Sequence, residues 1–502
     1  MGAFPNPDEA YYWLWGQHWD WSYFDHPPLH AWIQGIFAAG LGRSHFVLRL
    51  PTLITTGLLI WLYGVICQHL YGKQATNALG LTVLLMLTSP LFFLFTAMAW
   101  HDHWLVLFGT AASYCLIRFL SNDRLDTYPW LYGAGGLIGL AGLCKYVALF
   151  LGLGFLMAIA THRRWRSLFW QGHLYGAIGL AILMLAPVFW WNLQHDSYSF
   201  RFYLGRSVQA EAVAIQWFGP IGFLLLSGLI FGPMHVWLTV KATQRGGTTR
   251  LGATYQRVAF VIFGTSTLVL ALLSFQAPVL YYWNILAYPL LLPLMVGGFL
   301  SPYRLHELRD RRLLNGTLTL GTLAAALLVV HYTVLPLSAL VSPTGDDDTR
   351  MLYGWQSVAE WVKREAAVLA ENPLLLTTDY RSASALAYVW GKPSVMALSG
   401  RIDQFDFWYN PATLAGRDAI LLGDRWHPIC PAHLAMFEHT DAPTNLDVKR
   451  LGIEIKTYTV VRGYGFRPQG VTADPFSPDY PLAFTSDGET CAATSRAIVA
   501  PS

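Results

Sequence analysis

The sequence predicts a mainly α-helical, polytopic transmembrane bundle with a small α/β or α+β domain at its carboxyl end. Three observations predict this fold class. Of the 502 residues, 54% are hydrophobic and only 13% are charged, whereas soluble domains carry about 25% charged residues. The 21 Trp and 25 Tyr are numerous, and both rings concentrate at membrane–water interfaces. Long apolar runs end near residue 340, where polar sequence begins.

The amino-terminal segment, residues 1–45, contains no run long enough to cross a bilayer. Residues 28–41 are amphipathic, and Pro27 and Pro28 at their start are a typical helix-start signal. We therefore expect an interfacial helix that lies along the membrane surface.

Residues 46–340 are predicted to form the transmembrane domain, because runs of about 20 apolar residues can cross a bilayer as helices. Ten stretches are candidate spans: 46–71, 75–98, 103–121, 129–144, 146–161, 168–191, 214–240, 257–275, 279–300 and 313–336. Only Lys145 separates 129–144 from 146–161. This spacing predicts a tight hairpin whose tip places one ammonium near a membrane face.

Residues 341–502 are predicted to form a soluble domain after a linker that contains Pro343, Gly345 and an acidic run at 346–348. A helix is expected at 355–371, and short apolar runs follow at 374–378, 386–390, 394–398 and 419–423. This alternation is typical of a small α/β or α+β module. Its sequence contains neither a nucleotide-binding glycine loop nor a nucleophile elbow.

Basic residues are distributed unevenly between alternate loops, and cytoplasmic loops normally hold the excess. One set of loops contains fourteen Lys and Arg, whereas the other, without the C-terminal domain, contains five: Arg43, Arg49, Lys145, Arg201 and Arg206. The count places residues 1–45, the 99–102 turn, the 192–213 loop and the C-terminal domain on the outer face. Since a chain that starts outside is awkward to translocate, we expect a further transmembrane helix upstream of Met1.

Charge and cysteine content narrow the function classes. A formal net charge of +3, evenly spread, does not provide a nucleic-acid-binding surface. Cys67, Cys115 and Cys144 lie in apolar runs and are expected to pack as small hydrophobic side chains. Cys430 and Cys491 lie in polar sequence, where an oxidising compartment would allow one disulfide, although their spacing leaves the pairing open.

Ionisable side chains concentrate in the expected outer loops: Asp8, Glu9, Asp20, Asp25, His26, His101, Asp102 and His103. Such groups are costly at a membrane boundary unless they are paired or solvated, so their default interpretation is functional. One alternative is that they only cap helices, because Asp8 precedes an apolar run from Ala10 to Trp15. Another is a divalent metal site built from His101, Asp102 and His103 with His26, Asp25 or Glu9, although adjacent residues rarely bind one ion together.

Several motifs stand at the expected outer face. The first loop reads PDEAYYW at 7–13, WDW at 19–21 and YFDHPPL at 23–29. Further along the chain are Asp102 after SPLF at 89–92, Lys145-Tyr146 at the hairpin tip, and SFRF at 199–202 before Arg206. These residues resemble bacterial GT-C glycosyltransferases of the protein-mannosyltransferase superfamily, which includes the transferases that add aminoarabinose or galacturonic acid to lipid A. The resemblance covers residues 5–210 and is weak in the C-terminal domain.

The resemblance implies inverting transfer of a sugar from a polyprenyl-phosphate carrier, such as undecaprenyl phosphate, at the periplasmic face of the bacterial inner membrane. Asp8 would be the general base that removes the acceptor proton. Glu9 and Asp102 would hold the acceptor or orient Asp8. The acceptor would be lipid A, another glycolipid or polysaccharide, or a protein, and no nucleotide or other cofactor is required.

The leaving phosphate gains negative charge, so the site needs cations or hydrogen-bond donors there. By resemblance these are Lys145, Arg206 and His26. Alternatively, Lys145 only extends to the membrane interface, and Arg206 forms a salt bridge with Glu211. The resemblance further assigns substrate contacts to Tyr11, Tyr12 and Asp25.

Two positions depart from the pattern of the aminoarabinose transferases. Tyr11 stands where those enzymes have Arg, and His26 stands where they have Lys. His26 would be cationic only below its ordinary pKa of about 6.5. The loss of two cations argues against the same donor sugar.

Two other functions compete with the enzyme. A transporter of a lipid or sugar would fit the many helices, but transporters usually show inverted repeats and broken helices, and the sequence shows neither. A scaffold or assembly subunit is supported only by the C-terminal domain.

Overall fold

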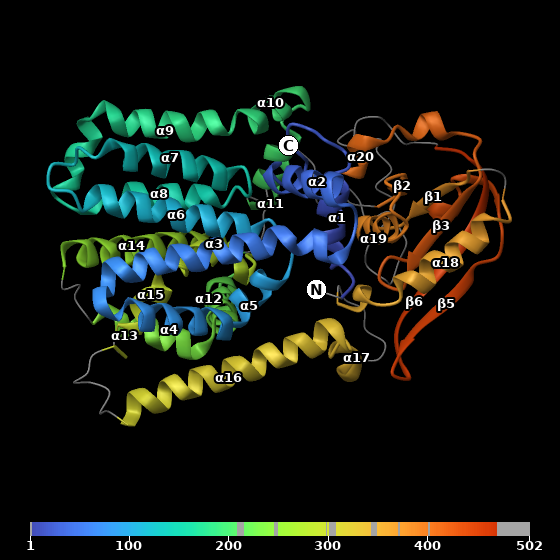
Figure 1. The fold of residues 1–502 in the computed structure, drawn as a ribbon. Helices are drawn as coiled ribbons and strands as arrows, with labels where there is room; N and C mark the ends of the chain where they lie inside the picture. Colours follow the sequence, from blue (N-terminus) through green and yellow to red (C-terminus); the bar gives the residue numbers. More distant parts are fainter. Residues whose placement is uncertain are drawn as a thin grey trace.

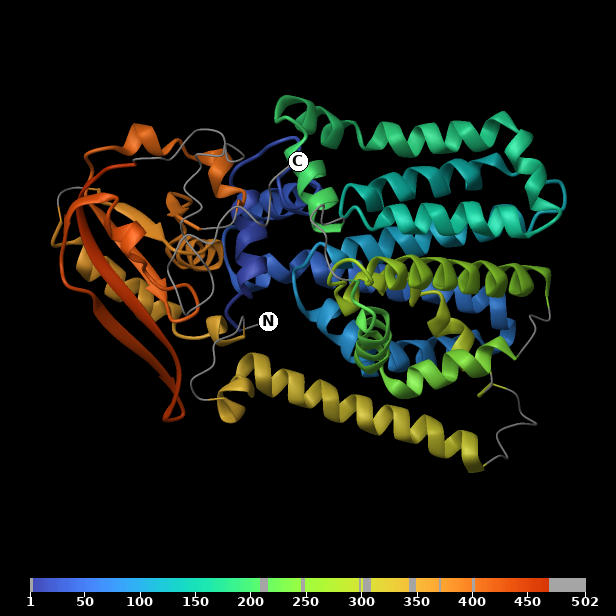
Figure 2. The ribbon, with the colours of Figure 1, turned by 180° about the vertical axis from the view of Figure 1, so that it is seen from behind.

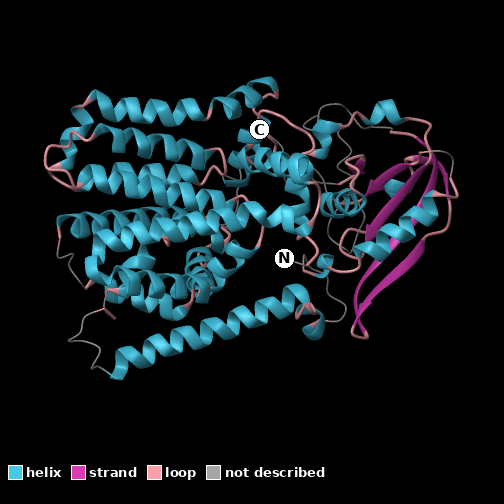
Figure 3. Ribbon diagram, in the orientation of Figure 1, coloured by secondary structure: helices cyan, strands magenta, loops and turns pink. Residues whose placement is uncertain are grey.

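The computed structural model of the protein describes residues 3–207, 215–244, 249–297, 299–300, 308–342, 349–369, 372–399 and 402–468. A bundle of helices forms one half of the molecule, and a twisted sheet with its helices forms the other (Figure 1, Figure 3). Helices α1 (Pro7–Trp15) and α2 (Leu29–Leu41) lie between the two halves.

The bundle consists of α-helices with short 3₁₀ segments between some of them. They are α3 (His45–Tyr71), η1 (Gly72–Gln74), α4 (Ala75–Thr88), α5 (Pro90–Ala97), α6 (Asp102–Leu120), α7 (Tyr128–Gly142), α8 (Ala148–Thr161), η2 (Trp165–Trp170), α9 (Gly172–Met184), α10 (Ala186–Gln194), α11 (Tyr198–Ser207), α12 (Gly219–Phe231), α13 (Pro233–Thr243), α14 (Arg250–Leu273), η3 (Tyr281–Ala287), α15 (Leu291–Val296), α16 (Leu308–Thr333) and α17 (Ser338–Val341). One or two α-helices therefore cover most of each predicted apolar stretch, whereas 279–300 contains only η3 and the short α15.

Four helical segments are long and apolar enough to cross a membrane: His45–Thr88, Asp102–Leu120, Arg250–Leu273 and Arg311–Thr333. The bent pairs α9 with α10 and α12 with α13 raise the number to six in the described part of the chain. The predicted count of ten is therefore not confirmed. Helices α7 and α8 have only 15 and 14 residues, and each is shorter than the roughly 20 that a lone span needs.

The stretch 279–300 does not form the single continuous helix expected of a span, because η3 and the six-residue α15 replace it. Pro289 lies between them and cannot donate to a continuous helix. The hydroxyls of Tyr63 and Tyr255 donate to the carbonyls of Pro289 and Leu290, both at 3.0 Å. Side chains of α3 and α14 thus satisfy backbone groups that the interrupted helix leaves open.

Broken helices were not expected from the sequence, and the structure corrects this. Breaks separate α4 from α5, α9 from α10 by 49°, and α12 from α13 by 96°. Pro90, Pro187 and Pro233 each stand in the first turn of the second helix. Proline fits there because its missing N–H would have no helical partner.

The two ends of the bundle carry different loops. The C-terminal domain, α1, α2 and the turn between α7 and α8 lie at one end (Figure 2). At the opposite end, Asp123 forms ion pairs with Arg164 at 3.5 Å and with Arg250, which joins three of the basic loops. This grouping of the loops agrees with the one predicted from the distribution of Lys and Arg.

The C-terminal domain is a mixed sheet of β1 (Leu374–Thr377), β2 (Val395–Ala397), β3 (Ala419–Asp424), β4 (Phe437–Thr440), β5 (Thr444–Arg450) and β6 (Ile453–Phe466). The strand order is β2-β1-β3-β6-β4, with β5 on β6. β1 is parallel to β2 and β3, whereas β6 is antiparallel to β3. The domain also contains η4 (Arg350–Leu352), α18 (Trp355–Ala366), α19 (Tyr380–Trp390), α20 (Phe405–Trp408), η5 (Pro411–Leu414) and α21 (Pro431–Leu434).

The sequence predicted α18 and the strands β1, β2 and β3 at nearly their observed positions. The apolar run at 386–390 is not a strand but the end of α19, whose start is capped by Asp379. The antiparallel strands β4 to β6 were not predicted. Cys67 and Cys144 are buried in the bundle as expected, while Cys491 lies outside the described residues, so its pairing with Cys430 stays a prediction.

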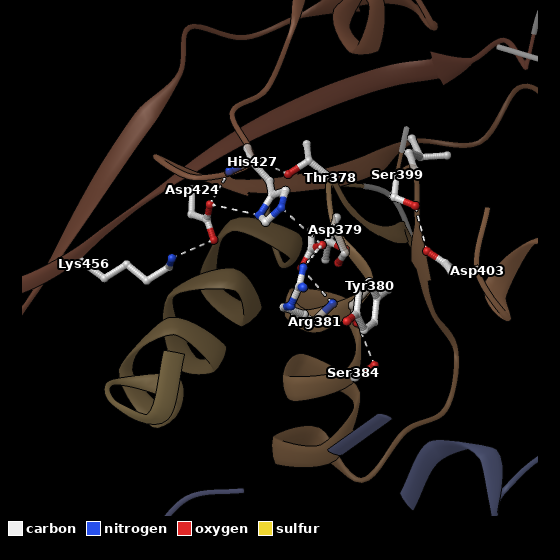
Figure 4. Close-up of polar contacts among 12 residues, drawn as sticks. Thr378, Asp379, Tyr380, Arg381, Ser384, Ser399, Asp403, Asp424, His427 and Lys456 are labelled. Atoms are coloured by element: carbon white, nitrogen blue, oxygen red, sulfur yellow. Dashed lines mark hydrogen bonds and ion pairs between the residues drawn. The ribbon is translucent and has the colours of Figure 1, made fainter. Parts of the chain in front are cut away.

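Buried charges at the carboxyl ends of β1 and β3 hold the start of α19 (Figure 4). The Nε2 atom of His427 is 3.5 Å from the carboxylate of Asp379, and Lys456 Nζ is 3.0 Å from Asp424. Burial alone would raise the pKa of Asp424, but Lys456 and His427 outweigh burial and hold that pKa at about 2. This network of buried ion pairs fixes the start of α19, which packs directly against α1.

Helix α1 shares a hydrophobic core with the C-terminal domain although more than 300 residues separate them. The Tyr11 ring centroid is 4.8 Å from that of Tyr380, and the Trp13 centroid is 5.1 Å from that of Tyr388. The C-terminal domain therefore fixes the helix on which Asp8 and Glu9 lie.

Candidate active site

Asp102 and Lys145 form a buried ion pair at the end of the bundle that carries α1. Lys145 Nζ lies 3.0 and 3.2 Å from the two carboxylate oxygens of Asp102, and both side chains are buried. The backbone N–H of Leu29 donates to the carbonyl of Leu143 at 3.0 Å, which ties this turn to α2. The ammonium therefore lies inside the protein, and the alternative in which Lys145 only extends to the membrane interface is wrong.

Glu9 joins three segments through four hydrogen bonds. Its carboxylate accepts from Arg49 Nε at 2.9 Å and Nη2 at 2.7 Å, from the Ala99 N–H at 2.6 Å, and from the Asn6 N–H at 2.8 Å. Burial alone would raise the pKa of Glu9, but Arg49 outweighs burial and lowers it. These bonds fix the first turn of α1, on which Asp8 lies, and the expectation that Glu9 orients Asp8 or holds the acceptor stays a prediction.

The helix-capping role considered as an alternative for Asp8 belongs to Asn6. The Asn6 side chain accepts from the Asp8 N–H at 3.0 Å, and Glu9 accepts from the Asn6 N–H, so the two form a capping box. The Asp8 carboxylate is thereby not used as the helix cap.

We expect Glu9→Gln to destabilise the protein by about 3–5 kcal/mol, because it leaves the buried Arg49 guanidinium without its counter-ion. Thermal unfolding of the detergent-purified protein measures this loss. The double variant Glu9→Gln/Arg49→Met should recover most of the stability. An unchanged unfolding temperature for Glu9→Gln alone would contradict the role of Glu9 as the link between these segments.

Tyr12 lies one helical turn after Asp8 and contacts His101, the residue before Asp102. Asp8 is half-buried in the first turn of α1, and Tyr12 follows on the same face four residues later. Burial raises the pKa of Tyr12 well above its ordinary value, and the charges of Asp8 and Asp102 add to this rise. The Tyr12 ring meets the ring of His101 edge-on, with centroids 5.1 Å apart.

Tyr11 and Asp25 bind each other and the C-terminal domain. The Tyr11 hydroxyl donates to Asp25 Oδ2 at 2.8 Å and accepts from the Gln404 N–H at 2.8 Å. The Gln404 side chain in turn accepts from the Phe24 N–H at 2.7 Å. Tyr11, which stands in place of an arginine, therefore fixes the first loop against the C-terminal domain.

His26 lies beside His101, with ring centroids 4.1 Å apart, and shares a 2.6 Å hydrogen bond with the hydroxyl of Tyr203. Tyr203 belongs to α11, which also contains Arg206. The side chain of Arg206 and the whole of Glu211 lie outside the described residues. The roles assigned to Arg206 therefore stay predictions.

Three tyrosines of the site were not predicted as site residues from the sequence. Lys145 Nζ lies 5.1 Å from the ring centroid of Tyr282, in η3. Tyr146 shares a 2.9 Å hydrogen bond with Ser199, and its ring meets that of Tyr203 at 4.7 Å. Only Tyr146 stood in a quoted motif.

Within the described part of the chain, no group of three or more His, Cys, Asp or Glu side chains is placed to hold a metal ion. Of the ligands considered from the sequence, Asp102 is paired with Lys145, Glu9 is paired with Arg49, and His103 Nδ1 is 2.8 Å from Thr55 Oγ1.

Comparisons with known proteins show the family of this chain and its fold. Residues 25–191 match the family model described as dolichyl-phosphate-mannose-protein mannosyltransferase. The lipid A galacturonosyltransferase RgtD of Rhizobium johnstonii is 26% identical over 393 residues, which are 75% of this chain and 76% of that protein. This chain is a GT-C glycosyltransferase.

The crystal structure of ArnT from Cupriavidus metallidurans bound to undecaprenyl phosphate matches with a TM-score of 0.61 and 16% identity, over 92% of this chain and 94% of that one. The apo form of the same protein matches with a TM-score of 0.58 and 15% identity over the same shares. This glycosyltransferase therefore shares its fold with ArnT over nearly its whole length, including the C-terminal domain, where the sequence resemblance is weak.

Proposed function

We propose that this glycosyltransferase moves a sugar from a polyprenyl-phosphate carrier to a lipid acceptor at the periplasmic face of the bacterial inner membrane. The observation that carries the proposal is the convergence of α1, the start of α6 and the Lys145 turn at one end of the bundle. A similar solved protein holds undecaprenyl phosphate, and the relative RgtD is named for lipid A. The count of basic loop residues assigns this end to the outer face.

In the proposed reaction, the Asp8 carboxylate removes the proton from the acceptor hydroxyl as its oxygen attacks the anomeric carbon of the donor. The bond between that carbon and the phosphate oxygen breaks, the phosphate leaves with the electron pair, and the anomeric centre inverts. A positioned general base contributes about 10²–10⁴ in rate. Glu9 holds the turn on which Asp8 lies, so we assign Glu9 a positioning role.

Lys145 is assigned to the leaving phosphate, where a fixed positive charge stabilises the charge that develops. Asp102 orients the ammonium through the 3.0 Å contact. His26 and Arg206 are proposed as further donors to the phosphate, and Tyr11, Tyr12 and Asp25 as residues that shape the substrate site. Transfer from a phosphate leaving group requires no nucleotide or other cofactor in this scheme.

Transfer by the purified protein in proteoliposomes tests the proposal. The donors are undecaprenyl phosphates that carry galacturonic acid, 4-amino-arabinose or a neutral hexose, and the acceptors are lipid A and a protein extract. Mass spectrometry should detect a new glycosidic bond on lipid A with at least one donor. Movement of donor between leaflets without a new bond would indicate a transporter and contradict the proposal.

A further inference from the structure

His101 is a buried histidine beside the Asp102–Lys145 pair, and neither of its ring nitrogens has a hydrogen-bond partner among the described residues. Its Nε2 atom is 3.3 Å from Asp102 Oδ2, but this contact lacks hydrogen-bond geometry. Lys145 donates to both oxygens of that carboxylate. Because buried polar groups are normally hydrogen-bonded, we expect the ring nitrogens of His101 to bind a group of a ligand.

The neighbouring histidines differ from His101 in this respect. His30 Nε2 is 2.9 Å from the carbonyl of Ala99, and His103 Nδ1 is 2.8 Å from Thr55 Oγ1. Each of these rings is thus anchored through one nitrogen, as expected for a structural role. His101 is held by ring packing, by the backbone at the start of α6 and by the 3.3 Å contact of Nε2 with Asp102, and neither of its nitrogens makes a hydrogen bond among the described residues.

The chemistry of a neutral imidazole suits a hydroxyl group. Burial lowers the pKa of His101 well below its ordinary value, and nearby His26 and Lys145 lower it further. A neutral ring offers one N–H donor and one nitrogen acceptor, which matches a hydroxyl group, since a hydroxyl both donates and accepts. Phosphate oxygens mainly accept hydrogen bonds, and Lys145 already provides donors and a positive charge for them.

We infer that His101 binds a hydroxyl group of the donor sugar, next to the phosphate that Lys145 holds. His101 and Lys145 contact the same carboxylate of Asp102, and the ring hydroxyls of a sugar phosphate lie similarly close to its phosphate. The inference rests on the proposed function. It makes His101 a residue that recognises the sugar and Lys145 a residue that recognises the phosphate.

Binding of two lipids to the detergent-purified full chain separates these roles. The probes are undecaprenyl phosphate and the same lipid carrying the sugar that supports transfer. His101→Phe should leave undecaprenyl phosphate binding unchanged and weaken binding of the sugar-linked lipid by about tenfold, as expected for one lost hydrogen bond. Lys145→Ala should weaken binding of both lipids. His173→Phe is the matched control, because His173 is exposed at the start of α9.

Equal binding of the sugar-linked lipid by wild type and His101→Phe would overturn the inference, and so would an equal loss for both lipids. If His101→Phe does not fold, wild type and His101→Gln are titrated with donors that each lack one ring hydroxyl. One of these donors should then bind wild type about tenfold more weakly, and uniform binding of all of them would overturn the inference. If wild type transfers sugar from none of the donors, that result contradicts the proposed function itself and not only the role of His101.

Discussion

Asp8→Asn is expected to lower the rate of transfer by about 10²–10⁴-fold while leaving the affinity for the donor lipid nearly unchanged. Asparagine preserves the size of the side chain and the N–H that donates to Asn6, but it cannot accept the acceptor proton. The loss should therefore fall on kcat rather than on KM for the donor. Initial rates in proteoliposomes at saturating donor measure the effect.

The matched control for Asp8→Asn is Asp126→Asn, because Asp126 is an exposed aspartate after the far end of α6. The 19 residues of α6 separate this end from Asp102 by roughly 28 Å. Both variants should unfold at the wild-type temperature. Transfer by a well-folded Asp8→Asn protein within about twofold of wild type would refute the general-base assignment.

The positions of most helices in the bundle could be predicted from apolar runs, because apolar sequence is needed to cross lipid. The number of spans could not, since α7 and α8 have only 15 and 14 residues. Backbone hydrogen bonding within the bundle could not be predicted in the same way. The run at 279–300 is apolar enough to be predicted as a span, yet its helix is interrupted. Tyrosine hydroxyls from α3 and α14 donate to the backbone carbonyls that the interruption leaves without helical partners. Hydropathy along the sequence cannot predict these contacts, since they join residues more than 30 positions apart.

Part of the candidate site could be predicted because topology alone brings outer turns together. The charge count assigned both the 99–102 turn and Lys145 to the outer face, and the structure pairs Asp102 with Lys145. The partner of Glu9 was missed, because Arg49 lies 40 residues away inside α3. Gln404 was missed for the same reason, since 393 residues separate it from Tyr11.

Lys145→Ala is expected to abolish transfer and also to destabilise the protein by about 3–5 kcal/mol, because it leaves the Asp102 carboxylate buried without a partner. The two effects have separate causes, and a second variant distinguishes them. Asp102→Asn/Lys145→Met removes both charges and should restore most of the unfolding temperature without restoring transfer. Lys145→Arg keeps a cation at the site and should retain partial activity.

The donor titration decides what the ammonium does. If Lys145 holds the leaving phosphate, the folded double variant should bind undecaprenyl phosphate more weakly by at least about tenfold, since hydrogen bonds to charged groups contribute about 1.5–3 kcal/mol. If Lys145 only compensates Asp102, removal of both charges should leave lipid binding and transfer intact. Wild-type activity of the double variant would therefore show that the ion pair has only a structural role and that the phosphate binds elsewhere.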